Sequence, residues 1–273
     1  MAKKGRSPLF TRLARQSNLP DILPSAACVS ALFDAAFALL KRVGYRHEYI
    51  YRAALTHKIL LGVHSLQTAS MLNEFRVGEC KADVAILNGT ATVYEIKSER
   101  DSLSRLERQV TAYSTVFAKV YVIASEDHVD AVSRMVPDSV GIMQLNRRYQ
   151  ISTLREAIEQ PERTSPIAIF DSIRTAEAKM LLSSLGISVP SVPNTRMHAV
   201  LREYFALLDP AQTHSEMVRV LKRTRNLLPL STLVNQLPLS LQTAALSVPL
   251  RKADHERLIT AVNSSMEDAM GWA

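Results

Sequence analysis

Three ionisable residues lie in two adjoining apolar segments, at a spacing that could support chemistry. The stretch 83–97 contains two apolar runs joined by an Asn-Gly pair, and it carries Asp83, Glu95 and Lys97. Each run is typical of a β-strand, and Asn-Gly is a strong hairpin signal. Burying a carboxylate or an ammonium costs several kcal/mol unless it is paired, hydrogen-bonded or bound to a metal. Three such groups in one hairpin therefore indicate a site.

The register of this hairpin decides whether the two carboxylates meet. A strict two-residue Asn-Gly loop would pair Asp83 with Tyr94 and turn Glu95 to the opposite face. A three-residue loop at 88–90, or a bulge, would place Asp83 across from Glu95. Because the chemistry requires both acids on one face, we predict the second arrangement.

Two carboxylates at one sheet surface form the oxygen-rich kind of site that Mg²⁺ prefers, and Mn²⁺ is an alternative ion. Such an ion polarises a phosphoryl oxygen and lowers the pKa of a bound water, while a nearby lysine orients that water. With Asp83 and Glu95 as metal ligands and Lys97 beside them, the pattern favours phosphodiester hydrolysis. The competing interpretation is structural: an exposed Glu95–Lys97 pair on an edge strand, with Asp83 at a strand end.

The elements around the hairpin predict an α/β fold. Apolar residues at helical spacing and short apolar runs follow one another in the order helix, three strands, helix, strand. The predicted helices are 26–43, 49–61, 102–117 and 129–135, and the further predicted strands are 72–77, 120–124 and 140–145.

Beyond residue 150 the strand signals end and prolines punctuate a helical pattern. The predicted helices there are 152–159, 167–185, 196–208, 213–224 and 254–262. We therefore expect three parts: a basic N-terminal arm at 1–25, an α/β domain at 26–147 and an all-helical C-terminal domain at 148–273.

The charge of the chain favours a polyanionic partner. Its formal net charge is +7, and its first 20 residues hold five cations and no acid. In a second acid-free segment, Arg219, Lys222 and Arg223 share a helix face by their spacing, so we expect them to contact nucleic acid. A solvated basic surface is the alternative.

The hairpin and its flanking elements resemble the PD-(D/E)XK nuclease superfamily, although Ala82 replaces the proline of that name. The resemblance implies a nuclease-like core, a central mixed sheet flanked by helices, with Asp83, Glu95 and Lys97 as catalytic residues. It also implies a further metal-binding acid, for which Glu74 is the candidate. Gln109 and Tyr113 resemble a Gln-x-x-x-Tyr element that RecB-like members place beside the site.

The segments 94–109 and 169–174 resemble more closely a bacterial family of nuclease-like proteins related to RecB. This resemblance covers most of the chain. It implies a Mg²⁺-dependent DNA endonuclease or exonuclease in DNA repair or anti-phage defence, with Gln109 in a catalytic role and Tyr113 in contact with nucleic acid.

Two other classes of function stay open. One is a catalytically silent nucleic-acid-binding or protein-interaction module on the same scaffold, and the other is a toxin or defence effector. DNA is the expected partner and RNA is not excluded. We also expect a homodimer and a protein partner bound through the C-terminal helices. The chain has two cysteines and no apolar run of membrane-spanning length, so we expect a cytoplasmic location without membrane contact.

Overall fold

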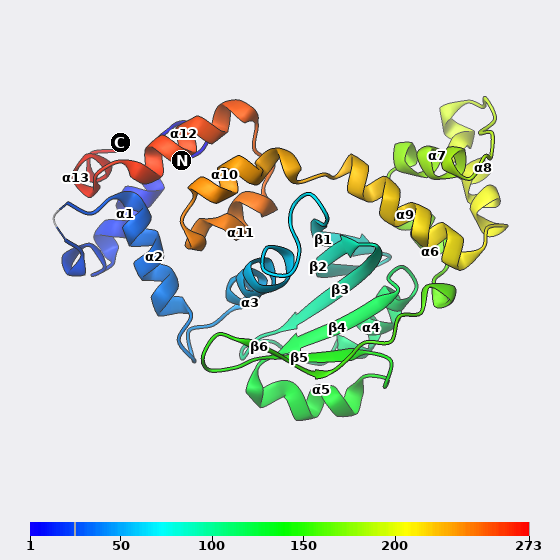
Figure 1. Cartoon of the computed structure of the whole chain (residues 1–273), viewed down its shortest axis with the longest axis horizontal. Helices are drawn as coiled ribbons and strands as arrows, with labels where there is room; N and C mark the ends of the chain where they lie inside the picture. The colour runs from blue at the N-terminus through cyan, green and yellow to red at the C-terminus, as the bar shows by residue number, and fades with distance from the viewer. Residues whose placement is uncertain (25, 273) are drawn as a thin grey trace. The chain divides into compact units, whose positions relative to one another are not determined.

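The computed structural model describes residues 1–24 and 26–272 and divides the chain into two compact units (Figure 1). The sheet unit consists of residues 47–227, and the helical unit combines residues 1–46 with residues 228–273. This division differs from the expected boundaries. Residues 26–46 pack with the last part of the chain, and residues 148–227 pack with the sheet.

The sheet unit is built on one mixed sheet of six strands in the order of the sequence. β1 to β3 form an antiparallel meander, β3 to β5 run parallel, and β6 is antiparallel to β5. The strands are β1 (Ser70–Val77), β2 (Cys80–Asn88), β3 (Thr90–Lys97), β4 (Lys119–Ala124), β5 (Gly141–Leu145) and β6 (Ile151–Arg155). An α/β class with a mixed sheet is thus confirmed.

The last strand corrects a prediction, because β6 lies where the sequence predicted a helix at 152–159. Its side chains are half-buried or exposed, so the segment lacks the apolar alternation by which a strand is recognised. Backbone pairing with the edge of β5 forms this strand, and a partner edge is a tertiary feature.

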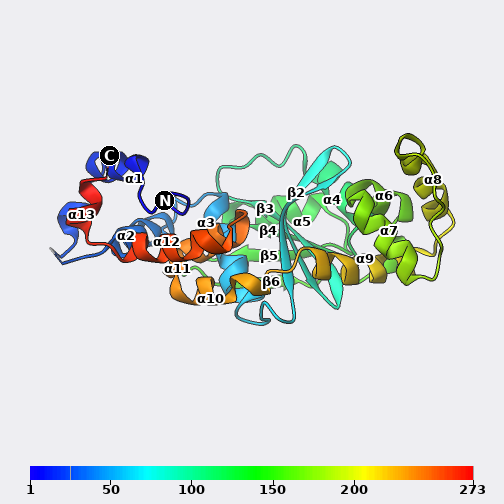
Figure 2. The same cartoon turned by 90° about the horizontal axis from the view of Figure 1, so that it is seen from above.

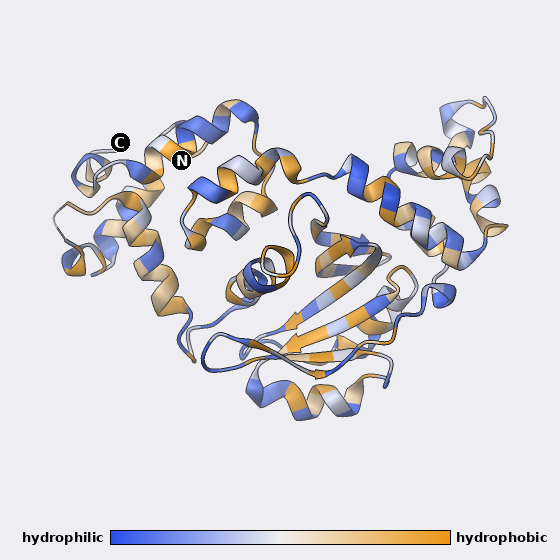
Figure 3. Ribbon diagram, in the orientation of Figure 1, coloured by the Kyte–Doolittle hydropathy of each residue, from blue (hydrophilic) through white to orange (hydrophobic). Residues whose placement is uncertain are grey.

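Two crossover helices cover one face of the sheet. α4 (Leu106–Ser114) connects β3 to β4, and α5 (Val129–Met135) connects β4 to β5. Parallel crossovers are right-handed, so two crossovers that advance in one direction place their helices on the same face. Their apolar residues join those of the strands in one buried cluster. In Figure 3, β4 and β5 are coloured as strongly hydrophobic, as expected for strands buried on both faces.

The remaining helices of the sheet unit precede and follow the sheet. α3 (Glu48–Leu55) continues into a π-helical turn at Thr56–Leu60 and packs against β3. After β6 come α6 (Pro166–Ser172), α7 (Thr175–Ser184), α8 (Asn194–Ala206) and α9 (Pro210–Thr224). The single helix predicted at 167–185 is wrong, since α6 and α7 are separated by extended residues. The Glu177 carboxylate accepts the Arg174 N–H there, which caps the new helix.

In the helical unit, the segment expected to be a basic N-terminal arm contains a packed helix. α1 (Pro8–Gln16) buries Phe10 and Ala14. The Thr11 hydroxyl donates to the Ala269 carbonyl at 2.8 Å, which ties α1 to the end of the chain. The other helices of this unit, visible in Figure 2, are α2 (Val29–Leu40), α10 (Ser231–Gln236), α11 (Leu239–Ser247), α12 (Lys252–Asn263) and α13 (Met266–Met270).

Candidate functional site

The β2–β3 hairpin has the register that brings its two acids together. Val84 pairs with Tyr94, so the same register places Asp83 across from Glu95. The predicted loop is confirmed: the two strands close at the Asn88–Thr90 pair, and Gly89 between them has φ +72°. A left-handed residue suits glycine, which has no Cβ to clash there.

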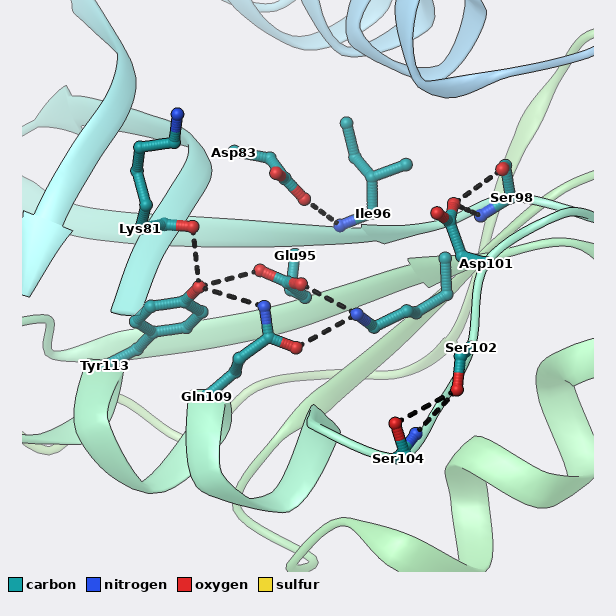
Figure 4. A network of polar contacts seen from close by, with 11 residues as sticks. Lys81, Asp83, Glu95, Ile96, Ser98, Asp101, Ser102, Ser104, Gln109 and Tyr113 are labelled. Carbon is teal, nitrogen blue, oxygen red and sulfur yellow. Dashed lines mark hydrogen bonds and ion pairs between the residues drawn. The ribbon is translucent and has the colours of Figure 1, made fainter. Parts of the chain in front are cut away.

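A network of polar side chains then fixes the Glu95 carboxylate (Figure 4). Lys97 Nζ donates to Glu95 Oε1 at 2.9 Å and to Gln109 Oε1 at 3.0 Å. The Tyr113 hydroxyl lies 2.9 Å from Glu95 Oε2 and 3.0 Å from the Lys81 carbonyl oxygen. Both oxygens of Glu95 therefore have a donor within the chain. Glu95 and Lys97 are only 2% and 4% exposed, which makes this a buried ion pair.

The structure brings together Asp83, Glu95, Lys97, Gln109 and Tyr113, as the sequence predicted for their positions. Tyr113 is fully buried, however, so the predicted direct contact with nucleic acid does not fit. Its hydroxyl positions Glu95 instead.

The two carboxylates of this cluster influence each other. Burial, and then the charge of Glu95, raise the pKa of Asp83 to about 7 from an ordinary value of 3.8. The Ile96 N–H, which donates to Asp83 Oδ2 at 2.8 Å, opposes this shift. Burial also raises the pKa of Glu95, and the Lys97 ammonium works against that rise. Near neutral pH the pair therefore holds a proton more readily than two exposed carboxylates would.

A polar cavity of about 260 Å³ opens beside this pair. Asp83, Glu95, Lys97 and Gln109 line it, together with the exposed cations Lys81, Arg105 and Arg108.

Glu74 lies outside this cavity. It occupies the β1 position level with Asp83, but its side chain is 56% exposed and pairs with Lys81 at 3.0 Å. Its φ of +54° is unusual for a residue other than glycine. The structure thus does not bring the predicted third acid, Glu74, to the site.

Asp83 and Glu95 are the carboxylates that could hold a divalent cation at this cavity. The described residues contain no group of three or more His, Cys, Asp or Glu placed to hold a metal ion. Mg²⁺, however, is often held by one or two carboxylates and keeps several waters. Asp83 and Glu95 lie across from each other, and the charge of Glu95 contributes to the raised pKa of Asp83, so a cation between them would relieve that repulsion. The pair therefore fits one hydrated ion.

A second candidate site is a basic groove between α7 and α9. Its volume is about 570 Å³, and its lining includes Lys179, Arg219 and Arg223 with the hydroxyl residues Ser183 and Ser184. We call this the α7–α9 groove. Arg219 and Arg223 stand one turn apart on α9, as their spacing predicted.

Lys222 does not belong to the α7–α9 groove. Its Nζ donates to the Thr68 carbonyl at 2.7 Å, so it holds α9 to the segment before β1. Sequence reasoning missed Lys179 and its neighbouring serines, because they lie on another helix and carry no recognisable spacing with α9.

Fold and site together define a mixed α/β protein with a self-paired carboxylate–lysine cluster and a separate basic groove. The model of the family described as bacteriophage P4 protein cII matches residues 41–226, and the chain belongs to that family. The matched range nearly coincides with the sheet unit at 47–227.

Comparison with curated proteins gives the same result. Protein cII of Enterobacteria phage P4 is 31% identical over 129 residues, which cover 45% of this chain and 48% of that protein. The similarity thus spans about half the length of that relative. No solved structure matches this chain.

This membership corrects the assignment made from sequence. The chain is not a PD-(D/E)XK nuclease, and the predicted metal-dependent DNA endonuclease or exonuclease activity, with its repair or defence role, is wrong. The assignment was wrong because an acid on one strand followed by Glu-x-Lys on the next is a loose pattern that occurs in many unrelated proteins. The same three residues form an internally paired buried network, in which Lys97 is already bonded to Glu95 and Gln109.

Proposed function

We propose that this protein is a phage-type regulatory protein that binds nucleic acid through the α7–α9 groove without cleaving it. Membership of the P4 cII family supports the regulatory part of the proposal. The groove supports the binding part, and it lies within the residues matched by that family.

The α7–α9 groove has the chemistry of a phosphate-contacting surface. Arg223 is exposed, and Arg219 is 73% exposed although it pairs with Glu216 at 2.6 Å. Lys179 adds a third cation across the groove, and the serine hydroxyls can donate to phosphate oxygens. Cations and hydroxyls of this kind bind the backbone of DNA or RNA with little dependence on base sequence.

The carboxylate cluster has a supporting role in this proposal. Its network ties α4 to the β2–β3 hairpin through the Tyr113 and Gln109 side chains. We also propose that Asp83 and Glu95 hold one Mg²⁺ or Mn²⁺ ion, which would add to the stability of the hairpin. A rise in melting temperature with MgCl₂ that is lost in Asp83→Asn would support this; an equal rise in both proteins would contradict it.

Fluorescence anisotropy with labelled duplex DNA, single-stranded DNA and RNA tests the binding proposal. We expect Arg223→Glu to weaken binding at least tenfold at low salt and to reduce the slope of log K against log salt by about 1 to 2. The matched control is Arg134→Glu, an exposed arginine on α5 that does not line the groove. Equal effects of the two variants, or no binding to any of the three probes, would refute the proposal.

Two expectations about the whole protein remain predictions. No helix among residues 1–24 and 26–272 is both long enough and apolar enough to cross a membrane. The expected cytoplasmic location and the expected homodimer are tested by cell fractionation and by light scattering of the purified protein.

A further inference from the structure

An apolar groove lies within the helical unit, and its lining contains no residue of the function proposed above. Its volume is about 440 Å³. Side chains of α1 and α2 line it, together with Leu241 of α11 and Leu258 of α12. We call this the α1–α2 groove. It lies outside residues 41–226, the part of the chain that the cII family model matches.

Two leucines of α1 are left without a complete hydrophobic environment in this groove. Leu9 and Leu13 are 54% and 53% exposed and stand one turn apart, so their side chains form one stripe. The next positions around the helix, Phe10 and Ala14, are buried against the unit's own core. The apolar surface of α1 is therefore larger than the part of it that the helical unit buries.

The surroundings of the groove are strongly basic. Lys3, Lys4, Arg6 and Arg12 are exposed within or just before α1, and no acid occurs among the first 20 residues. The helical unit contains 11 Lys and Arg against 6 Asp and Glu, so it carries five of the seven net positive charges of the chain. The sheet unit, which is about twice as long, carries only two.

We propose that the α1–α2 groove binds an acidic amphipathic helix of a partner protein. An apolar groove accepts the apolar face of a helix with anchors at i, i+3 or i+4, and i+7. The cations beside the groove select acidic residues on the flanks of that helix and speed its association. A second copy of this unit would bring two net positive surfaces together. A bilayer is flat, whereas the groove is concave and formed by four helices.

A designed peptide tests this inference independently of nucleic-acid binding. The probe is a 16-residue helical peptide with leucines at i, i+3, i+7 and glutamates on both flanks. Trp272 is the single tryptophan of the chain, and its ring lies 5.7 Å from that of Phe10, which lines the groove. Titration followed by tryptophan fluorescence therefore reports occupancy in the full-length protein. We expect saturable binding that weakens with salt.

Variants then locate the binding surface. Leu13→Glu should weaken peptide binding at least tenfold, since it places a carboxylate in the apolar stripe and repels the acidic flanks. Ile22→Glu is the matched control, because Ile22 is 71% exposed in the same unit and does not line the groove. Both positions are exposed, so both variants should keep the wild-type melting temperature.

Several outcomes would overturn the inference. A peptide with lysines in place of the glutamates that binds equally well would contradict the acidic chemistry. Equal loss in Leu13→Glu and Ile22→Glu would contradict the location. Self-association abolished by Leu13→Glu would assign the groove to a second copy. Binding of anionic phosphatidylserine vesicles, without binding of the peptide, would assign it to a membrane surface.

Discussion

Removing the lysine of the buried ion pair should destabilise the protein in a strongly pH-dependent way. The change Lys97→Met keeps most of the side-chain volume and deletes the ammonium that donates to Glu95 at 2.9 Å. Glu95 is only 2% exposed, so its carboxylate would lose its cation in a low-dielectric site beside Asp83. Breaking a buried pair in this way typically costs about 3 to 5 kcal/mol.

Protonation of Glu95 sets an upper limit to this cost. The free energy of keeping Glu95 protonated at pH 7 is about 3 kcal/mol, because pH 7 lies well above the ordinary glutamate pKa of 4.5 and each pH unit corresponds to about 1.4 kcal/mol. At pH 5 the same cost is under about 1 kcal/mol. We therefore expect a loss of about 3 kcal/mol at pH 7 and a much smaller loss at pH 5.

Urea unfolding followed by circular dichroism at both pH values measures this difference. The double variant Glu95→Gln with Lys97→Met should recover stability at pH 7, because it removes the unpaired charge. Lys81→Met is the control, since Lys81 forms an exposed pair with Glu74 and should cost less than about 1 kcal/mol. Equal destabilisation at pH 5 and pH 7 would refute the electrostatic explanation and indicate a packing defect.

Three further changes test other parts of the sheet unit. Asp83 has a raised folded pKa of about 7, so its contribution to stability is lost as pH rises from about 4 through 7; Asp83→Asn should remove that decline in urea titrations. Burial lowers the pKa of His214 to about 4 from 6.5, so the free energy of unfolding falls as pH drops below about 6.5. His214→Gln should reduce this loss of stability at low pH. The loss of stability that Asp83 causes at higher pH should remain in that variant. At Gly141, a Cβ would overlap the Tyr121 ring and approach the Ala157 nitrogen at 2.8 Å. Gly141→Ala should therefore destabilise the protein by about 1 to 3 kcal/mol and lower its melting temperature by several degrees. An unchanged melting temperature would contradict this prediction.

Local patterns predicted the elements that are stabilised locally. The apolar runs in β2 to β5 and the helical spacing in α4 place these elements close to their observed positions. The Asn-Gly pair left two registers of the Asp83 hairpin open, and the observed one was chosen on the basis of a chemistry that proved wrong. By contrast, β6 depends on the edge of β5, and α1 is ordered by contacts with Ala269 near the other end of the chain. Neither partner is visible within a local window.

The same distinction applies to the candidate sites. Residue types and spacing identified Asp83, Glu95, Lys97 and Gln109 as one cluster, but the chemistry inferred from them was wrong. The types and spacing of Asp83, Glu95 and Lys97 do not reveal whether these charged groups contact a substrate or pair with one another. The family match decided the class of protein, and the geometry shows that Lys97 is engaged by its own neighbours.

By itself, the sequence determined the α/β class, the presence of the hairpin and the basic face of α9, because strand alternation, turn chemistry and helical periodicity are local properties. Tertiary structure alone decided that Tyr113 is buried, that Glu74 points outward and that Lys179 faces α9. It also joined residues 1–46 to residues 228–273 in one unit. Burial, pairing and grooves depend on which distant segments pack together, and that information is spread over the whole chain.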